Sequence, residues 1–259
     1  MTRTADGSAG DADYGAIGRG YTTYRQPDPR ILAAVLSAFG DAQTIVNVGA
    51  GAGSYEPVDR DVTAVEPSAS MRAQRPPMLA PAVDATAEAL PFPDGTFDAA
   101  LASFTVHQWA DLEAGLREMR RVTRGRVVIL TCDPDSLDRF WLAQYAPEVV
   151  ATEAARYPTI ARIADGLGGR VETVRIPIPL DCTDGFGEAY YGRPEALLDP
   201  GARLANSAWS FVGEEVEDRF TRELADDLAN GMWDARWGHL RTSPEFDGSL
   251  RVVIGHPGS

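Results

Sequence analysis

The stretch Thr44-Ile-Val-Asn-Val-Gly-Ala-Gly-Ala-Gly-Ser54 decides the fold. Its aliphatic residues run directly into Gly49, Gly51 and Gly53, a pattern that predicts a buried parallel strand ending in a tight turn. Glycine has no Cβ, so the backbone of such a turn can adopt unusual dihedral angles, approach a bound molecule closely and offer N–H groups to it. We therefore expect a ligand to bind at this turn.

The next predicted strand, Val62-Thr-Ala-Val65, ends at Glu66. A carboxylate at the tip of the second strand of a βαβ unit is placed to accept hydrogen bonds from both ribose hydroxyls of a nucleoside. The position of Glu66 therefore predicts an adenosine-containing cofactor.

The glycine spacing separates two classes of such a cofactor. A dinucleotide-binding turn prefers G-x-G-x-x-G, but Ser54 stands where its last glycine would fall, and the pattern is G-x-G-x-G. About a dozen residues separate the two strands and Pro57 interrupts them, so about one turn of helix fits there. A pyrophosphate would gain from a full helix dipole, whereas S-adenosylmethionine (SAM) carries no phosphate. The spacing therefore favours SAM.

Four segments, in the right order, resemble the class I SAM-dependent methyltransferases, particularly the ubiquinone/menaquinone C-methyltransferase-like (methyltransferase type 11) group. They are Val46-Asn-Val-Gly-Ala-Gly-Ala-Gly53, Val65-Glu-Pro-Ser68, Val83-Asp-Ala-Thr-Ala-Glu-Ala-Leu-Pro-Phe-Pro-Asp-Gly-Thr-Phe-Asp98 and Phe104-Thr-Val-His-Gln-Trp109. The resemblance covers roughly residues 14–131. One departure is Asn47, because the family often has aspartate there.

The resemblance implies SAM as the cofactor, with S-adenosylhomocysteine (SAH) as its product, and it implies the cofactor-binding residues. In the core these are Gly49, Ala50, Gly51, Gly53, Glu66, Pro67, Asp84, Ala85, Thr86 and Phe104. Asp84 would contact the adenine amino group and the backbone of Ala85 the adenine ring. The alternative is that Asp84 merely caps a turn.

The segment from Tyr14 to Arg25 is rich in tyrosine. The resemblance implies that this segment folds over the cofactor, with Tyr14 and Arg25 as binding residues and Arg25 near the methionine carboxylate. It also implies that Tyr21 or Tyr24 lies near the methyl group. The alternative is an ordinary amphipathic surface segment.

His107 is the best candidate for acid–base chemistry. It follows the predicted strand Phe97–Phe104, and in open α/β sheets ligands bind outside the carboxyl ends of the strands. The unperturbed pKa of histidine, about 6.5, lets it accept a proton near neutrality. The alternative is a packing residue that Asp111 holds by a hydrogen bond.

We expect an α/β, Rossmann-like fold with a seven-stranded, mostly parallel sheet, helices on both faces and a helical cap insertion. Pro81–Asp84 is predicted as the third strand, and the helix after Asp28 should end at Gly40. Residues 1–13 are predicted to be disordered, and residues 14–179 and 246–259 to form the SAM-binding core. Residues 180–245, rich in aromatic residues, would form a cap that binds substrate, since long insertions in compact domains are usually lids or binding elements.

The composition of the chain limits the classes of molecule that it is expected to bind. The formal charge of −14 and the isoelectric point near 4.6 argue against nucleic acids and anionic membranes, because both attract basic surfaces. Cys132 and Cys182 give neither a metal-binding spacing nor a disulfide framework. With no apolar run near 18 residues and no signal sequence, we expect a cytoplasmic protein, monomer or homodimer, that acts on a small molecule.

The sequence therefore predicts a methyltransferase that acts on a small aromatic or heteroaromatic secondary metabolite, by C- or O-methylation. Two alternatives stay open. One is a SAM-binding cyclase or sensor that transfers no methyl group. The other is a nicotinamide-dependent oxidoreductase, which the glycine spacing disfavours.

Overall fold

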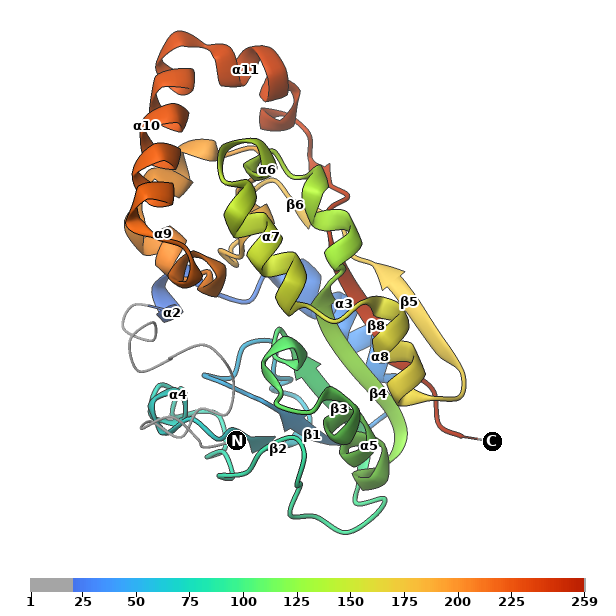
Figure 1. Ribbon diagram of the computed structural model, residues 1–259. Coiled ribbons are helices and arrows are strands. Elements are labelled where there is room, and N and C mark those ends of the chain that lie inside the picture. Colours follow the sequence, from blue (N-terminus) through green and yellow to red (C-terminus); the bar gives the residue numbers. More distant parts are fainter. Residues whose placement is uncertain (1–20, 259) are drawn as a thin grey trace.

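The computed structural model of the protein describes residues 21–258, and side chains from residue 23 onward. Its centre is a six-stranded sheet in the order β2-β1-β3-β4-β8-β5 (Figure 1). The strands are β1 (Thr44–Val48), β2 (Asp61–Val65), β3 (Phe97–Ser103), β4 (Thr123–Cys132), β5 (Val171–Arg175) and β8 (Leu250–Gly255). The first four run parallel, and β8 runs antiparallel to β4 and β5, so the sheet is mostly parallel as predicted.

The predicted count of seven strands is wrong by one. Where a third strand was expected, Val83 forms a single parallel bridge to Val65. Two causes limit the pairing: Pro81 has no N–H to donate, and the chain turns after Val83, where the N–H of Ala85 donates back to the carbonyl of Val83 at 3.1 Å. The edge beyond β2 therefore consists of one bridge rather than a strand.

Helices cover both faces of the sheet, as predicted. On one face α3 (Pro29–Phe39) begins at Asp28, whose side chain accepts a hydrogen bond from the N–H of Arg30, and ends at Gly40. Its buried residues share a core cluster with Leu101 of β3. On the other face α5 (Leu112–Val122) packs in a second cluster and α8 (Ile160–Leu167) lies beside it. Each helix has an apolar stripe at helical spacing, which explains the two separate clusters.

The chain between β5 and β8 forms a helical body above the carboxyl ends of the parallel strands (Figure 1). Two helices that precede it, α6 (Leu142–Tyr145) and α7 (Pro147–Arg156), contact it through α10 (Glu214–Asn230) and η5 (Ser207–Phe211). Its other elements are β6 (Ile178–Pro179), η3 (Gly187–Tyr190), η4 (Pro194–Leu198), α9 (Pro200–Leu204), α11 (Met232–Trp237), η6 (Gly238–Arg241) and β7 (Glu245–Phe246).

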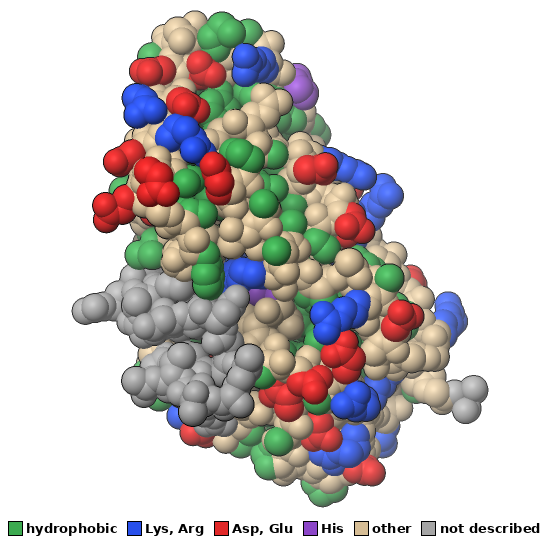
Figure 2. Space-filling model, viewed as in Figure 1, with side chains coloured by type: hydrophobic (Ala, Val, Ile, Leu, Met, Phe, Trp, Pro, Cys, Tyr) green, Lys and Arg blue, Asp and Glu red, His purple; other side chains and the backbone are tan. Residues whose placement is uncertain are grey.

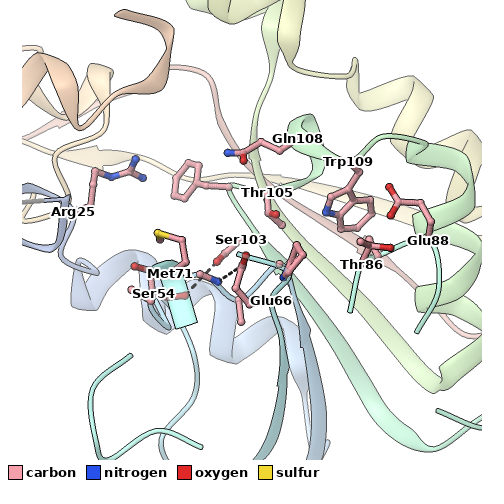
Figure 3. Close-up of a pocket in the computed structure, with 17 residues that line it drawn as sticks. Arg25, Ser54, Glu66, Met71, Thr86, Glu88, Ser103, Thr105, Gln108 and Trp109 are labelled. Carbon is pink, nitrogen blue, oxygen red and sulfur yellow. Dashed lines mark hydrogen bonds between the residues drawn. The ribbon is translucent and has the colours of Figure 1, made fainter. Parts of the chain in front are cut away.

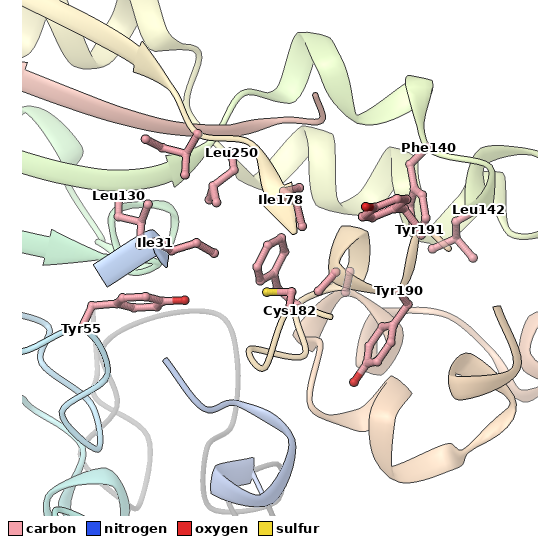
Figure 4. Packing of buried hydrophobic residues seen from close by; sticks show 14 of the residues in the cluster. Ile31, Tyr55, Leu130, Phe140, Leu142, Ile178, Cys182, Tyr190, Tyr191 and Leu250 are labelled. Carbon is pink, nitrogen blue, oxygen red and sulfur yellow. The ribbon is translucent and has the colours of Figure 1, made fainter. Parts of the chain in front are cut away.

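The core continues from the sheet into this helical body. Figure 4 shows Ile178 and Cys182 in the same buried cluster as Ile31 of α3 and Leu130 of β4. Most of the aromatic residues that the sequence placed here are buried, namely Phe186, Tyr190, Tyr191, Trp209 and Trp233. They hold the body on the sheet and leave few aromatic side chains to line a cavity.

The described surface is acidic over part of the helical body. Asp and Glu side chains gather over α10, whose first turn contains Glu214, Glu215 and Glu217 (Figure 2). Within residues 21–258, the search for a helix long and apolar enough to cross a bilayer finds none.

Candidate cofactor and acceptor site

The glycine turn after β1 has the geometry that its sequence predicts. The N–H groups of Gly49 and Ala50 both donate to the carbonyl of Val65, each at 2.9 Å. Gly49, Gly51 and Gly53 all have positive φ, at 69°, 52° and 98°. A Cβ on Gly49 would lie 2.1 Å from Oγ1 of Thr105. The turn therefore requires glycine at position 49 for both backbone and space.

Glu66 stands at the end of β2 with its carboxylate tied to the backbone. One carboxylate oxygen accepts from the N–H of Gly51 and the other from the N–H of Ser68, each at 2.8 Å. Burial raises the pKa of Glu66, although these two hydrogen bonds oppose the shift. The carboxylate is thus fixed against the glycine turn, where a lone pair of each oxygen remains for a ligand.

An elongated cavity runs across the carboxyl ends of β1, β2 and β3 and encloses about 840 Å³ of empty space, open solvent included. Figure 3 shows Arg25 at one end, Glu66 in the middle, and Trp109 with Thr86 and Glu88 at the other end. We call it the cofactor cavity. Its length and its central carboxylate suit a nucleoside that carries a chain on its ribose.

The cofactor cavity contains most of the residues predicted to bind the cofactor. Its walls include Arg25, Gly49, Ala50, Gly51, Glu66, Pro67, Thr86 and Phe104. Gly53, Asp84 and Ala85 do not line it. Gly53 faces Leu79, and Asp84 lies on the surface in an ion pair with Arg72 at 3.3 Å. Tyr14 and the side chain of Tyr21 lie outside the described residues.

Arg25 is held from the helical body. Its Nε donates to Oδ1 of Asp184 at 2.6 Å, and its guanidinium lies 5.2 Å from the ring centroid of Phe104. Tyr24, in the short helix α2 (Tyr21–Tyr24), points elsewhere and donates its hydroxyl to Asp199 at 2.7 Å. In this structure Tyr24 is therefore a contact to the helical body and does not line the cofactor cavity.

Phe104 closes the cofactor cavity with a strained backbone. Its φ is 49°, which is rare for a residue other than glycine. Its ring lies 5.6 Å from that of Phe186 and 6.0 Å from that of Tyr55. Such strain persists only where the surroundings fix it and is common at ligand sites.

His107, in η1 (Val106–Gln108), lines a second cavity. Its ring contacts that of Tyr157, with centroids 4.3 Å apart and ring planes tilted by 35°. Asp111 does not hold it, because that carboxylate caps α5 by accepting from the N–H of Ala114 at 2.9 Å. The second cavity shares Arg25, Phe104 and Gln108 with the cofactor cavity, so the two are adjacent. We call it the acceptor cavity.

Asn47 shows how the chain tolerates its departure from the family pattern. Its side-chain amide donates to Glu56 at 3.0 Å, and Glu56 forms a buried ion pair with Arg75 at 2.8 Å. An aspartate at position 47 would place a second carboxylate against Glu56. Asn47 avoids that repulsion and holds Glu56 beneath the turn.

Sequence reasoning missed several wall residues. Ser103, Thr105, Gln108 and Trp109 also line the cofactor cavity, at and after the carboxyl end of β3. Met71 and Glu88 line it as well, and neither has a distinguishing local pattern. Asp184 and Glu153 reach the site from distant segments, so no short motif could have identified them.

A glycine turn against a strand-end carboxylate, on a mostly parallel sheet with a cavity over its carboxyl ends, defines a nucleoside-binding Rossmann-like protein. Residues 46–130 match the family model described as a methyltransferase domain. A ubiquinone/menaquinone biosynthesis C-methyltransferase of Pasteurella multocida is 37% identical over 90 residues, which cover 30% of this chain and 34% of the relative. The chain thus matches about a third of that relative's length.

Solved structures show similarity over nearly the whole chain. A protein of Anabaena variabilis, described as a candidate methyltransferase from an antibiotic biosynthesis pathway, is 29% identical, with a TM-score of 0.83 over 90% of this chain and 98% of its own. The [4+2]-cyclase SpnF shares the fold, with 14% identity and a TM-score of 0.50 over 99% of this chain and 89% of its own. These matches confirm the resemblance of residues 46–130 to the class I SAM-dependent methyltransferases of the ubiquinone/menaquinone C-methyltransferase-like group. SAM is the cofactor of that class, and the cofactor cavity fits it.

Proposed function

We propose that the protein transfers the methyl group of SAM to a small aromatic or heteroaromatic acceptor of secondary metabolism, by C- or O-methylation. The observation that carries this proposal is the acceptor cavity, which adjoins the cofactor cavity at the Arg25 end and is roofed by the helical body. The antibiotic-pathway description of the Anabaena variabilis protein supports the acceptor class. The net charge of −14 favours a small acceptor over a nucleic acid.

The wall residues suggest how the cofactor would lie. Glu66 would accept hydrogen bonds from the ribose hydroxyls, and Thr86 and Trp109 would contact the adenine end. Arg25 would bind the methionine carboxylate. The turn at Gly49 and Gly51 would let the backbone approach the nucleoside. Asp84 and Ala85 would contact the adenine, and Gly53 would contribute to the shape of the cofactor-binding turn.

SAM supplies an electrophilic methyl group on a sulfonium. The protein would contribute position and the exclusion of water, for which effective molarities reach about 10⁵ M or more. The segment 180–245, together with α6 and α7, would serve as the cap that shields the acceptor cavity. His107 would take part in the transfer of a proton from the acceptor. The proposed role of Tyr24 near the methyl group requires its hydroxyl to leave Asp199.

One test is calorimetric titration with SAH and, separately, with NADH. We expect micromolar affinity for SAH and no binding of NADH. Glu66→Gln should weaken SAH binding by about tenfold or more, because hydrogen bonds to a charged acceptor are worth roughly 1.5–3 kcal/mol. NADH binding in place of SAH would overturn the assignment of SAM to the glycine turn, and SAH affinity unchanged in Glu66→Gln would remove Glu66 from the ribose site.

A SAM-binding cyclase is the second candidate, since SpnF shares the fold. Labelled SAM separates the two functions. A methyltransferase converts SAM to SAH in proportion to the acceptor consumed, whereas a cyclase rearranges its substrate and leaves SAM intact.

A further inference from the structure

Glu153 of α7 is a partly buried carboxylate that no described residue pairs with. It lines the acceptor cavity, and among residues 21–258 it has no hydrogen-bond or ion-pair partner for its side chain. Burial raises its pKa, and only the more distant charges of Arg156 and Arg25 oppose that shift. Even partial burial of an unpaired carboxylate costs free energy, so its presence in a cavity wall suggests a function.

The two arginines near Glu153 form hydrogen bonds with other groups. Arg25 donates to Asp184 at 2.6 Å, and Nη1 of Arg156 donates to the hydroxyl of Ser207 at 2.9 Å. Neither forms an ion pair with Glu153. The carboxylate therefore faces the cavity without a cation of its own.

Glu153 stands where two cavities of different character meet. Glu153, Cys132 and Phe186 line both the acceptor cavity and a third cavity. The acceptor cavity is polar on its other side, with His107, Gln108 and Asn206. The walls of the third cavity are mainly apolar, with Leu137, Phe140, Leu142 and Val150. A molecule that spans both would have a polar head toward the cofactor and an apolar part beyond Glu153.

We propose that Glu153 binds the acceptor through its protic group: the acceptor is an amphiphilic small molecule whose O–H or N–H donates to Glu153 while its apolar part enters the third cavity. This inference rests on the proposed methyl transfer. In that reaction the bond from the acceptor to the methyl carbon forms as the carbon–sulfur bond breaks, with its electron pair kept by sulfur. The proton of the protic group passes to the Glu153 carboxylate.

The neighbouring groups fit this role less well. Burial raises the pKa of the Tyr157 hydroxyl well above its usual range, so Tyr157 can donate a hydrogen bond but is a poor base. His107, whose ring contacts that of Tyr157, lines the same cavity and can orient the acceptor ring or relay a proton. Glu153 lines both the acceptor cavity and the apolar cavity, whereas His107 and Tyr157 line only the first of these two.

The test is a comparison of two probes on the SAH-loaded protein. We would titrate it with p-cresol, which has an O–H, and with 4-methylanisole, in which a methyl group replaces that proton, and use p-toluidine as the N–H counterpart. Wild type should bind p-cresol or p-toluidine about tenfold more tightly than the ether. Glu153→Gln should reduce that ratio to below about threefold and leave ether affinity near wild type. Thermal melting would verify that the variant folds.

Glu148→Gln is the matched control, because Glu148 lies on the same helix but is exposed and paired with Arg219. It should keep the wild-type ratio. Equal binding of the protic probes and the ether, a ratio unchanged in Glu153→Gln, or binding of none of the three probes would overturn the assignment of Glu153. Failure of SAH itself to bind would instead count against the proposed function.

Discussion

Nε of Arg25, at the end of the cofactor cavity, donates to Oδ1 of Asp184 across 2.6 Å, and these two residues are 159 positions apart in the sequence. Asp184 is only 2% exposed and also accepts from the hydroxyl of Tyr55 at 2.9 Å. This carboxylate therefore joins the N-terminal segment, the glycine turn region and the helical body. The position of Arg25 in the site depends on it.

Replacement of Asp184 by asparagine should destabilise the fold. Asparagine keeps the shape but removes the charge of Asp184 that faces Arg25, and breaking a buried ion pair costs roughly 3–5 kcal/mol. We expect the free energy of unfolding, measured in urea, to fall by about 3 kcal/mol. Asp181→Asn is the control, because Asp181 is 83% exposed in its pair with Arg30 and should contribute less than about 1 kcal/mol. Equal losses in the two variants would show that the buried pair is not a stabilising contact.

Arg25→Gln tests whether this guanidinium binds the carboxylate at the amino-acid end of the cofactor. SAH has a carboxylate there, and 5′-methylthioadenosine lacks the amino-acid part. We expect the variant to lose about tenfold or more in SAH affinity by calorimetry, because a charge-assisted hydrogen bond is removed. Methylthioadenosine affinity should stay within about twofold of wild type. A parallel loss for both ligands would mean that Arg25 acts on the fold of the site and not on the carboxylate.

Gly49→Ala should abolish SAH binding and destabilise the protein. The new Cβ would lie 2.1 Å from Oγ1 of Thr105, at a φ of 69° that L-residues rarely adopt. Gly231→Ala measures the cost of positive φ without a steric clash, because Gly231 has a φ of 77° but no atom within 4 Å of its Cβ position. The control should cost about 1–2 kcal/mol, and Gly49→Ala about 1–3 kcal/mol more, by chemical denaturation. Similar losses would remove the steric argument.

The local features of the fold were predictable because a few adjacent residues determine them. The caps Asp28 and Gly40 gave the bounds of α3, and the glycine turn with Glu66 gave the centre of the cofactor cavity. The lone bridge at Val83 was missed because strand pairing depends on a partner edge as well as on apolar residues.

The acceptor side was not predictable in the same way. Glu153 reaches the cavity from α7, and Asp184 reaches Arg25 across 159 positions. Neither residue stands in a motif that would distinguish it from an exposed carboxylate, although Gly185 follows Asp184. Their burial results from how the helical body packs on the sheet, and that packing is a tertiary property.

Glu188 should make stability fall as the pH rises through the range from about 4.5 to about 7. Glu188 is 3% exposed. The N–H of Ser249 donates to both of its carboxylate oxygens at 3.0 Å, and the hydroxyl of Ser249 donates to one of them at 2.5 Å. Burial raises the pKa of Glu188 to about 7. In the unfolded chain the ordinary value, 4.5, applies. Between these values the folded protein keeps a proton that the unfolded chain has released, so ionisation favours unfolding.

The comparison of wild type with Glu188→Gln isolates this titration, because glutamine has the same shape and does not ionise. The free energy of unfolding of wild type, minus that of the variant, should decrease by roughly 3 kcal/mol from pH 4.5 to pH 7.5, at about 1.4 kcal/mol per pH unit, and then level off. Carboxylates far from Glu188 affect both proteins equally: burial alone would raise the pKa of Asp28, but hydrogen bonds from Arg30 and Thr183 hold it at about 2. A difference that stays constant or increases with pH would mean that Glu188 is ionised in the fold and that the Ser249 hydrogen bonds outweigh its burial.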